Sequence, residues 1–211
     1  MPKSATIMHT VDFPFDDLEH EAWNAAVPVK IKSNWNGQRA TKIRRFETRI
    51  LWSDKALYVK FDANQGEPLV IHNFPKLDQK TKGLWHRDVC ELFIAPDRTE
   101  PHKYFEFEVA PTGEWFDLQI HVNADETRFN NDWISGIQTM TNITRDLVVM
   151  AIKVEWDAFG MTPAAGDTWL GNLFRCVGKG KTRGYLAWSA TRTEEPNFHV
   201  PERFGEFEFV N

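Results

Sequence analysis

The chain has 211 residues, a formal net charge of −5, 16 phenylalanines and 9 tryptophans. This acidic balance argues against a nucleic-acid partner, because phosphate binding requires a clustered cationic face. The sequence contains no run of eighteen apolar residues, which a membrane-spanning helix would require, and no helical period persists for three turns. Aromatic side chains must therefore supply much of the core of a chain rich in strands.

The first half of the chain contains a polar entry, a hairpin and a long loop. Residues 1–24 are rich in turn-forming residues, and we expect an N-terminal arm with a short helical turn. Two alternating runs, 48–52 and 56–61, flank a polar turn and predict a β-hairpin. Residues 65–83 carry two prolines and neither a helical nor a strand period. They predict a long surface loop, a kind of segment that often carries function.

Two strand-like runs after this loop, 88–94 and 104–109, place carboxylates between apolar residues. Successive side chains of a strand point to opposite faces, so each run has one apolar face and one acidic face. Glu91 lies on the acidic face of the first run, and Glu106 and Glu108 lie on that of the second. If the two strands are neighbours, the three carboxylates meet on one face of a sheet.

Trp85 stands at the entrance to this strand pair, beside residues that do not form a core pattern. A sugar ring buries its C–H groups against an aromatic face, while charged side chains bond its hydroxyl groups. Carboxylates beside an indole therefore suit a polyhydroxylated ligand. Packing of Trp85 into the core is the alternative interpretation.

The rest of the chain continues the strand pattern, with a second loop expected at 123–132. Further strands are predicted at 115–122, 137–143, 147–156 and 169–177. The spacing is regular and hairpin-like, and nothing resembles a linker or a repeat. We therefore predict an all-β fold, a single two-sheet antiparallel β-sandwich of jelly-roll or immunoglobulin-like type over residues 1–211.

The two cysteines, Cys90 and Cys176, lie inside apolar strand patterns, and we expect buried free thiols. A disulfide between them would require that their strands lie side by side. The N-terminus lacks the apolar run of a secretory signal. The location stays open between the cytoplasm and export with the signal removed.

Seven short motifs follow one another in order over residues 50–205. They are Ile50-Leu51-Trp52 with Leu57-Tyr58-Val59, Trp85-x-x-Asp88-x-x-Glu91-Leu92-Phe93, Tyr104-x-Glu106-Phe107-x-Val109-x-Pro111-x-Gly113, Pro163-x-x-Gly166-Asp167-x-Trp169, Asn172-x-x-Arg175, Ala187-Trp188-Ser189 and Phe198-His199-x-Pro201-x-x-Phe204-Gly205. This series resembles carbohydrate-binding module family nine, and the resemblance spans nearly the whole chain.

The resemblance implies a two-sheet sandwich related to the DOMON-type folds that bind sugars or haem. It also implies a sugar held between two aromatic rings near one end of the sandwich, and non-catalytic binding of a mono- or oligosaccharide. Carried over by position, the first ring falls on Trp85 and a carboxylate that bonds sugar hydroxyls falls on Glu91. Asp88 belongs to the same motif and joins the candidate ligand-binding residues.

The chain departs from the family pattern at two places. The sugar-clamping modules have a tryptophan shortly before the final Pro-x-x-Phe-Gly, where this chain has Phe198 followed by His199. Glu108 stands where those modules hold an arginine, and an anion in place of a cation changes what can bind. Asn172 and Arg175 complete the candidate ligand-binding set, with an interior hydrogen-bond network as their alternative role.

Two other classes of function stay open. A glycan-active hydrolase or lyase would use two acidic residues of the same face, such as Glu91 and Glu108. A scaffold would bind a peptide or protein partner there instead. We assign no catalytic residue.

Cofactor expectations are limited to one ion and one less favoured group. Acidic and amide oxygens cluster at 123–126 and 130–132, a composition that suits a structural calcium ion. Haem held by a methionine and a histidine is the less favoured alternative.

Overall fold

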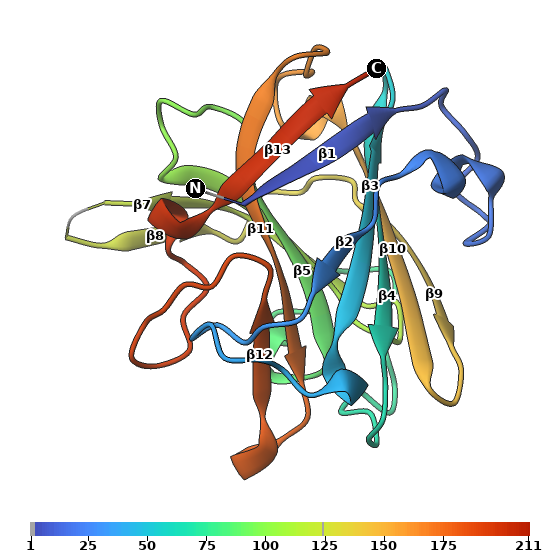
Figure 1. Cartoon of the computed structure of the whole chain (residues 1–211), viewed down its shortest axis with the longest axis vertical. Helices are drawn as coiled ribbons and strands as arrows, with labels where there is room; N and C mark the ends of the chain where they lie inside the picture. The colour runs from blue at the N-terminus through green and yellow to red at the C-terminus, as the bar shows by residue number, and fades with distance from the viewer. Residues whose placement is uncertain (1–2, 124) are drawn as a thin grey trace.

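The computed structural model describes residues 3–123 and 125–211, which form strands joined by loops and single-turn 3-10 helices (Figure 1). The strands are β1 (Ser4–His9), β2 (Val29–Ile31), β3 (Phe46–Trp52), β4 (Ala56–Asn64), β5 (Val89–Ala95), β6 (Lys103–Val109), β7 (Trp115–Val122), β8 (Thr127–Asn130), β9 (Gln138–Ile143), β10 (Leu147–Glu155), β11 (Thr168–Val177), β12 (Gly184–Ala187) and β13 (Gly205–Val210). The 3-10 helices are η1 (Glu21–Ala25), η2 (Lys42–Arg44), η3 (Leu84–His86), η4 (Trp156–Ala158), η5 (Gly180–Thr182) and η6 (Pro201–Arg203).

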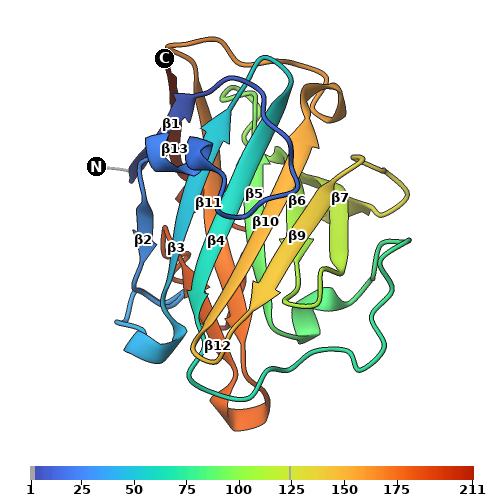
Figure 2. The same ribbon diagram turned by 90° about the vertical axis from the view of Figure 1, so that its right-hand side faces the viewer.

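The strands follow one hydrogen-bonded path in the order β8-β7-β6-β5-β11-β13-β1-β3-β4-β10-β9, with β12 beside β11 and β2 beside β3. The path bends at β13 and β1, so that the half containing β5 and β6 faces the half containing β4 and β10 (Figure 2). The predicted all-β sandwich is confirmed. Two pairings at the bend, β1 with β13 and β1 with β3, are parallel, whereas the others are antiparallel.

The main core lies between the two halves. Leu92 and Phe107 come from one half and Val59 and Ile152 from the other, and all four are fully buried. Removal of this apolar surface from water is the dominant stabilising term, at roughly 25 cal/mol per Å². The outer face of β5 and β6 therefore does not contribute to the main core, and polar side chains can occupy it.

The N-terminal segment differs from the expected arm. Residues 4–9 form β1 because they pair with β13 from the opposite end of the chain and bury Ile7 in the main core. Helix η1 supplies the expected helical turn. Between them, Phe13 stacks on Tyr58 with ring centroids 4.4 Å apart and covers the outer face of β4.

The hairpin β3–β4 and the long loop at 65–83 agree with the prediction. The second expected loop differs, because residues 127–130 form β8 and pair with β7. The calcium prediction for this segment includes Ala124, which lies outside the described residues. Within the described parts of the chain, no helix has the length and apolar character needed to cross a membrane.

The cysteines are buried free thiols, as predicted. Their strands do lie side by side, but Cys90 pairs with Arg175 while Cys176 pairs with Val89. This offset by one residue sends the two thiols to opposite faces of the sheet, Cys90 into the main core and Cys176 to the outer face. Lateral proximity of the strands is therefore not enough for a disulfide.

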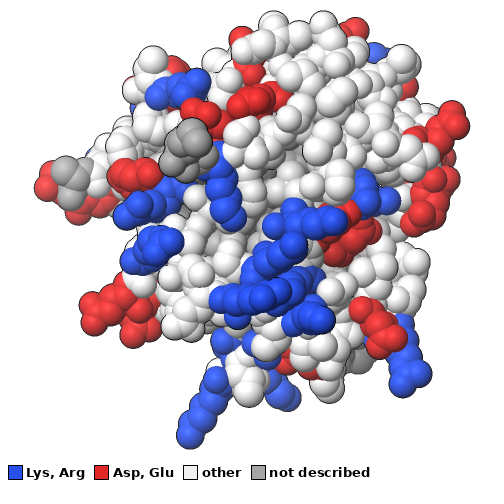
Figure 3. Space-filling view, in the orientation of Figure 1, with Lys and Arg blue, Asp and Glu red and all other residues white. Residues whose placement is uncertain are grey.

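Charged side chains are unevenly spread over the face seen in Figure 1. Lysine and arginine side chains form a band across its middle, and acidic side chains lie mostly toward its edges (Figure 3). The carboxylates singled out by the sequence, Glu91, Glu106 and Glu108, are buried and belong to no exposed acidic patch.

Candidate functional site

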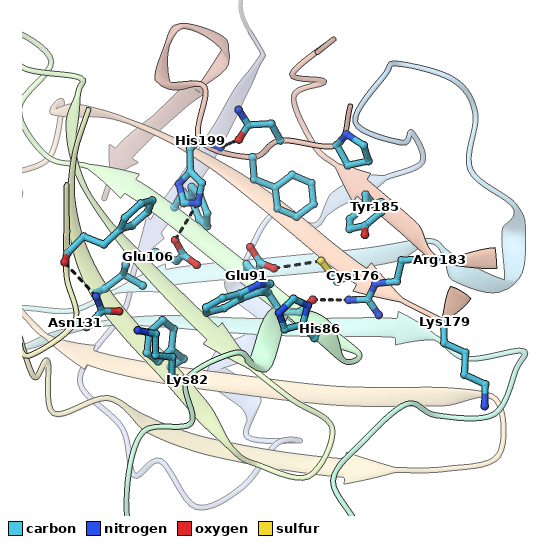
Figure 4. A pocket seen from close by; sticks show the side chains of 18 of the residues that line it. Lys82, His86, Glu91, Glu106, Asn131, Cys176, Lys179, Arg183, Tyr185 and His199 are labelled. Carbon is cyan, nitrogen blue, oxygen red and sulfur yellow. Dashed lines mark hydrogen bonds and ion pairs between the residues drawn. The ribbon is translucent and has the colours of Figure 1, made fainter. Parts of the chain in front are cut away.

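A pocket of about 720 Å³ lies over the outer face of β5 and β6 (Figure 4). This volume falls within the range of about 300–1,000 Å³ that is typical of small-molecule sites. Four buried residues from three adjacent strands form its base, and we call them the pocket floor: Glu91, Phe93, Glu106 and Cys176.

Strand alternation brings these residues to the floor. Glu91 and Phe93 of β5 point outward, and the intervening Leu92 points into the main core, as the sequence pattern predicts. On β6, Glu106 and Glu108 share the outward face. The acidic face expected from the sequence therefore exists, and a pocket stands over it.

One wall of the pocket is η3, which presents Trp85. Gly83 precedes the helix with φ of +83°, a left-handed conformation that favours glycine. Leu84 is fully buried and anchors the turn, while Trp85 stays 37% exposed with its ring 5.7 Å from that of Phe116. Arg183 secures the wall by donating hydrogen bonds to the carbonyl oxygens of Trp85 and Arg87.

Phe198 and His199 form a second wall of the pocket. Phe198 is 9% exposed and stacks on Phe174, with centroids 4.0 Å apart and ring planes 11° from parallel. The Tyr104 hydroxyl lies 2.9 Å from Nδ1 of His199, and Nε2 faces Oε2 of Glu106 at 4.0 Å. Burial lowers the pKa of His199 to about 4, so its imidazole is neutral at neutral pH.

Three carboxyl groups share one face of the β5–β6 pair. Glu91 stands directly opposite Glu108 in the strand register, and Glu106 is the diagonal neighbour of Glu91. Glu91, Glu106 and Glu108 are 2%, 5% and 0% exposed. Burial, assisted by the neighbouring carboxyls, raises the pKa values of Glu91 and Glu108 well above the ordinary range. Burial raises the pKa of Glu106 to about 7.

The carboxyl oxygens have few hydrogen-bond partners. Cys176 Sγ lies 3.5 Å from Oε1 of Glu91. Oε2 of Glu106 and both carboxyl oxygens of Glu108 are buried without a partner among the described residues. Within those residues, no group of three or more His, Cys, Asp or Glu side chains is arranged to hold a metal ion.

The structure brings four of the eight sequence-predicted residues to the pocket lining: Trp85, Glu91, Phe198 and His199. Glu108 does not line the pocket, because it lies fully buried beside Glu91 and Glu106. Its influence on the pocket is indirect, because its carboxyl group lies beside those of Glu91 and Glu106.

Asp88, Asn172 and Arg175 do not line the pocket. Asp88 accepts hydrogen bonds from the backbone N–H groups of Val70 and Gly178, and so connects the loop at 65–83 to the end of β11. The Asn172 side chain donates to the carbonyl of Ser189 and accepts from its N–H. Both residues have their polar atoms occupied by backbone groups.

Arg175 points to the inner side of the sheet, where its register partner is Cys90. Its guanidinium donates to the carbonyl oxygens of Arg44 and Asn64 and to the side-chain oxygen of Gln65. The alternative interior network is therefore present, with two carbonyl oxygens and one amide oxygen as the acceptors.

Several pocket residues were outside the predicted set. Phe116 and Leu118 follow the same alternation on β7 and could have been placed on this face from the sequence. Phe129 and Asn131 come from the β8 region, which the sequence presents as a loop. Arg183 and Tyr185 follow a turn after β11 and carry no pattern that assigns them to the pocket.

Known proteins resemble this chain in sequence and in fold. The family model described as "Carbohydrate-binding family 9" matches residues 24–209. An "Extracellular protein" of Arthroderma benhamiae is 24% identical over 176 residues, a match that covers 77% of each chain.

Solved structures match almost the whole chain in fold. A candidate carbohydrate-binding protein from Bacteroides uniformis has a TM-score of 0.77 at 16% identity and covers 99% of this chain and 100% of its own. A family 9 carbohydrate-binding module from Caldicellulosiruptor kristjanssonii, solved in complex with cellotriose, has a TM-score of 0.71 at 13% identity and covers 99% and 94%. A family 9 carbohydrate-binding module from the same organism is known in complex with glucose. The structures show a shared fold, and the family model, which covers most of the sequence, confirms the predicted resemblance: this chain belongs to carbohydrate-binding family 9.

Proposed function

We propose that the pocket binds a carbohydrate without converting it, with the sugar stacked on Trp85 and its hydroxyl groups bonded by Glu91 and Glu106. The observation that carries this proposal is the presence of a partly exposed indole and buried carboxyl groups in one pocket, in a chain of carbohydrate-binding family 9. Phe198 and His199 line the same pocket.

The chemistry of a pyranose matches these groups. Its C–H face gains stabilisation from apolar contact with an aromatic ring, and Trp85 retains 37% of its surface for such a contact. Its hydroxyl groups both donate and accept hydrogen bonds, so they complement carboxyl oxygens that lack a partner. Glucose and cellotriose, which are bound in the related family 9 structures, are the first ligands to test.

The state of the carboxyl groups supports binding over hydrolysis. A retaining glycosidase needs one ionised nucleophile and one protonated acid on either side of the bond that breaks. The pKa values of Glu91 and Glu108 are both raised by burial, and Glu108 does not reach the pocket. This pair therefore lacks the division into acid and nucleophile.

Calorimetric titration with glucose, xylose and cellotriose tests the proposal. We expect saturable binding to the wild type and a loss of about tenfold or more, at least 1.4 kcal/mol, in Trp85→Ala. Phe74→Ala is the matched control, because Phe74 is an aromatic residue that is 91% exposed and lies outside the pocket lining. Equal affinities for the wild type and Trp85→Ala, or no binding of any sugar, would contradict the proposal.

A further inference from the structure

The pocket floor presents hydrogen-bond acceptors that nothing in the described structure satisfies. Glu106 lines the pocket, is 5% exposed, and has a buried Oε2 with no hydrogen-bond partner. Among the described residues, the Glu91 side chain has only the Cys176 thiol as a hydrogen-bond partner, and the two buried oxygens of Glu108, which stands opposite Glu91, have none. A buried polar atom without a partner costs about 1–3 kcal/mol, which a bound ligand can recover by donating to it.

The cationic side chains around the pocket do not supply these donors. Arg183 lines the pocket, but its N–H groups donate to the carbonyl oxygens of Gly178, Trp85 and Arg87. Lys82 and Lys179 line the pocket as exposed residues. Among the described residues, no lysine or arginine nitrogen lies within 4.0 Å of Glu91, Glu106 or Glu108.

The histidine that approaches the floor, His199, does not supply a positive charge either. The low pKa of His199 leaves it neutral, with Nε2 still 4.0 Å from Glu106. His86 lines the pocket as an exposed residue next to Trp85. The floor therefore combines two acidic side chains, Glu91 and Glu106 (Figure 4), with Glu108 buried beside them, and no cation of the described residues is in contact with them.

We propose that this pocket selects an amino sugar, whose protonated amine lies at the floor and donates hydrogen bonds to Glu106 and Glu91. This inference rests on the proposed carbohydrate function and narrows its ligand class. An ammonium group carries three donors and no acceptor, so it complements the buried carboxyl oxygens of the floor once their protons are released. Its hydrogen bonds to carboxylates are charge-assisted and about twice as strong as those from a neutral hydroxyl.

A proton balance accompanies this binding. Glu106, with a pKa raised to about 7, is partly protonated in the free protein at neutral pH. An ammonium group favours the ionised carboxylate, so binding releases protons from the floor to solution. The other groups facing Glu106 are Glu91, Glu108, His199 and Tyr104, and none of them is cationic at this pH.

The test compares glucosamine, glucose and N-acetylglucosamine by calorimetry at pH 7, in two buffers of different ionisation enthalpy. The three sugars differ only at one substituent. We expect about tenfold tighter binding of glucosamine than of the two neutral sugars, together with a buffer-dependent heat that reports released protons. Glu106→Gln should remove most of this preference for glucosamine, because a neutral amide cannot form a charge-assisted hydrogen bond with the ammonium group.

Glu100→Gln is the matched control, since Glu100 is an exposed glutamate outside the pocket lining, and it should keep the preference for glucosamine. Near-ultraviolet circular dichroism checks that each variant is folded. Equal affinity for glucosamine and glucose would overturn the inference while leaving the carbohydrate function in place. An unchanged preference in folded Glu106→Gln would also overturn it, and binding of none of the three sugars would reject both proposals.

Discussion

Glu91 on β5 and Glu108 on β6 stand directly opposite each other across the antiparallel ladder, both essentially inaccessible to solvent. Like charges in this position destabilise a sheet. The two groups avoid this repulsion by holding protons, as their raised pKa values indicate. The apolar core supplies most of the stability of this fold, whereas the buried acidic cluster under the pocket reduces it. Clusters of ionisable groups with shifted pKa values are typical of functional sites.

Replacement of Glu108 by glutamine should stabilise the protein. Glu108 has two buried oxygens without a partner, and an amide of the same shape removes the ionisable group and adds a donor beside Glu91. We expect a gain of roughly 1–3 kcal/mol in the free energy of unfolding at pH 8. The gain should be smaller at pH 5, where the carboxyl group is already protonated. Urea denaturation at both pH values measures it, and a less stable Glu108→Gln protein at pH 8 would refute this view of the cluster.

The stability of the wild type should fall as pH rises from about 4.5 to about 7. The pKa of Glu106 rises on folding from its ordinary value of 4.5 to about 7. In this window the folded protein holds a proton that the unfolded chain has released, so each increase in pH favours unfolding. Thermal melting across this range measures the slope, and Glu106→Gln should flatten it. A slope that is the same in wild type and variant would show that other groups set the pH dependence.

Replacement of Arg175 should affect stability and leave sugar affinity unchanged. Arg175 is 2% exposed and donates to three oxygens from the segments around Arg44 and Asn64. Arg175→Gln leaves these acceptors unsatisfied, and we expect a loss of roughly 3 kcal/mol. Its affinity for sugars, measured below its melting temperature, should match the wild type. A weakened affinity in a variant of wild-type stability would return Arg175 to the binding set.

The two thiols should react only when the protein unfolds. Cys90 and Cys176 are 0% and 2% exposed, and burial raises both pKa values, that of Cys90 to about 12. Thiol-reactive reagents act on the thiolate. We expect no labelling of the native protein at pH 8, two labelled thiols in denaturant, and no change in melting temperature on addition of a reductant. Rapid labelling of one thiol in the native state would show that the pocket floor opens at Cys176.

Strand alternation was enough to predict the acidic face. It worked because β5 and β6 are long and amphipathic, so the period of two is visible in the sequence. It could not place Arg175, since the face that a residue of β11 occupies depends on its register with β5, and register is set by contacts between distant segments.

The elements that the sequence did not predict lack a local signal. β8 is polar and largely exposed at the end of the strand path, so it shows no apolar alternation. β1 forms because its partner β13 comes from the other end of the chain, and parallel pairing at such a separation leaves no turn motif between the two strands. The sequence therefore failed to predict β1 and β8 because each strand depends on its partner strand, and not because its residue types disfavour a strand.

The most direct test of the central claim is a crystal structure of the protein grown with a saturating amino sugar or cello-oligosaccharide that binds in solution. The account predicts electron density for a sugar ring on the indole of Trp85, with its polar groups directed to Glu91 and Glu106. A sugar bound at another surface, with this pocket empty, would contradict the assignment of the site.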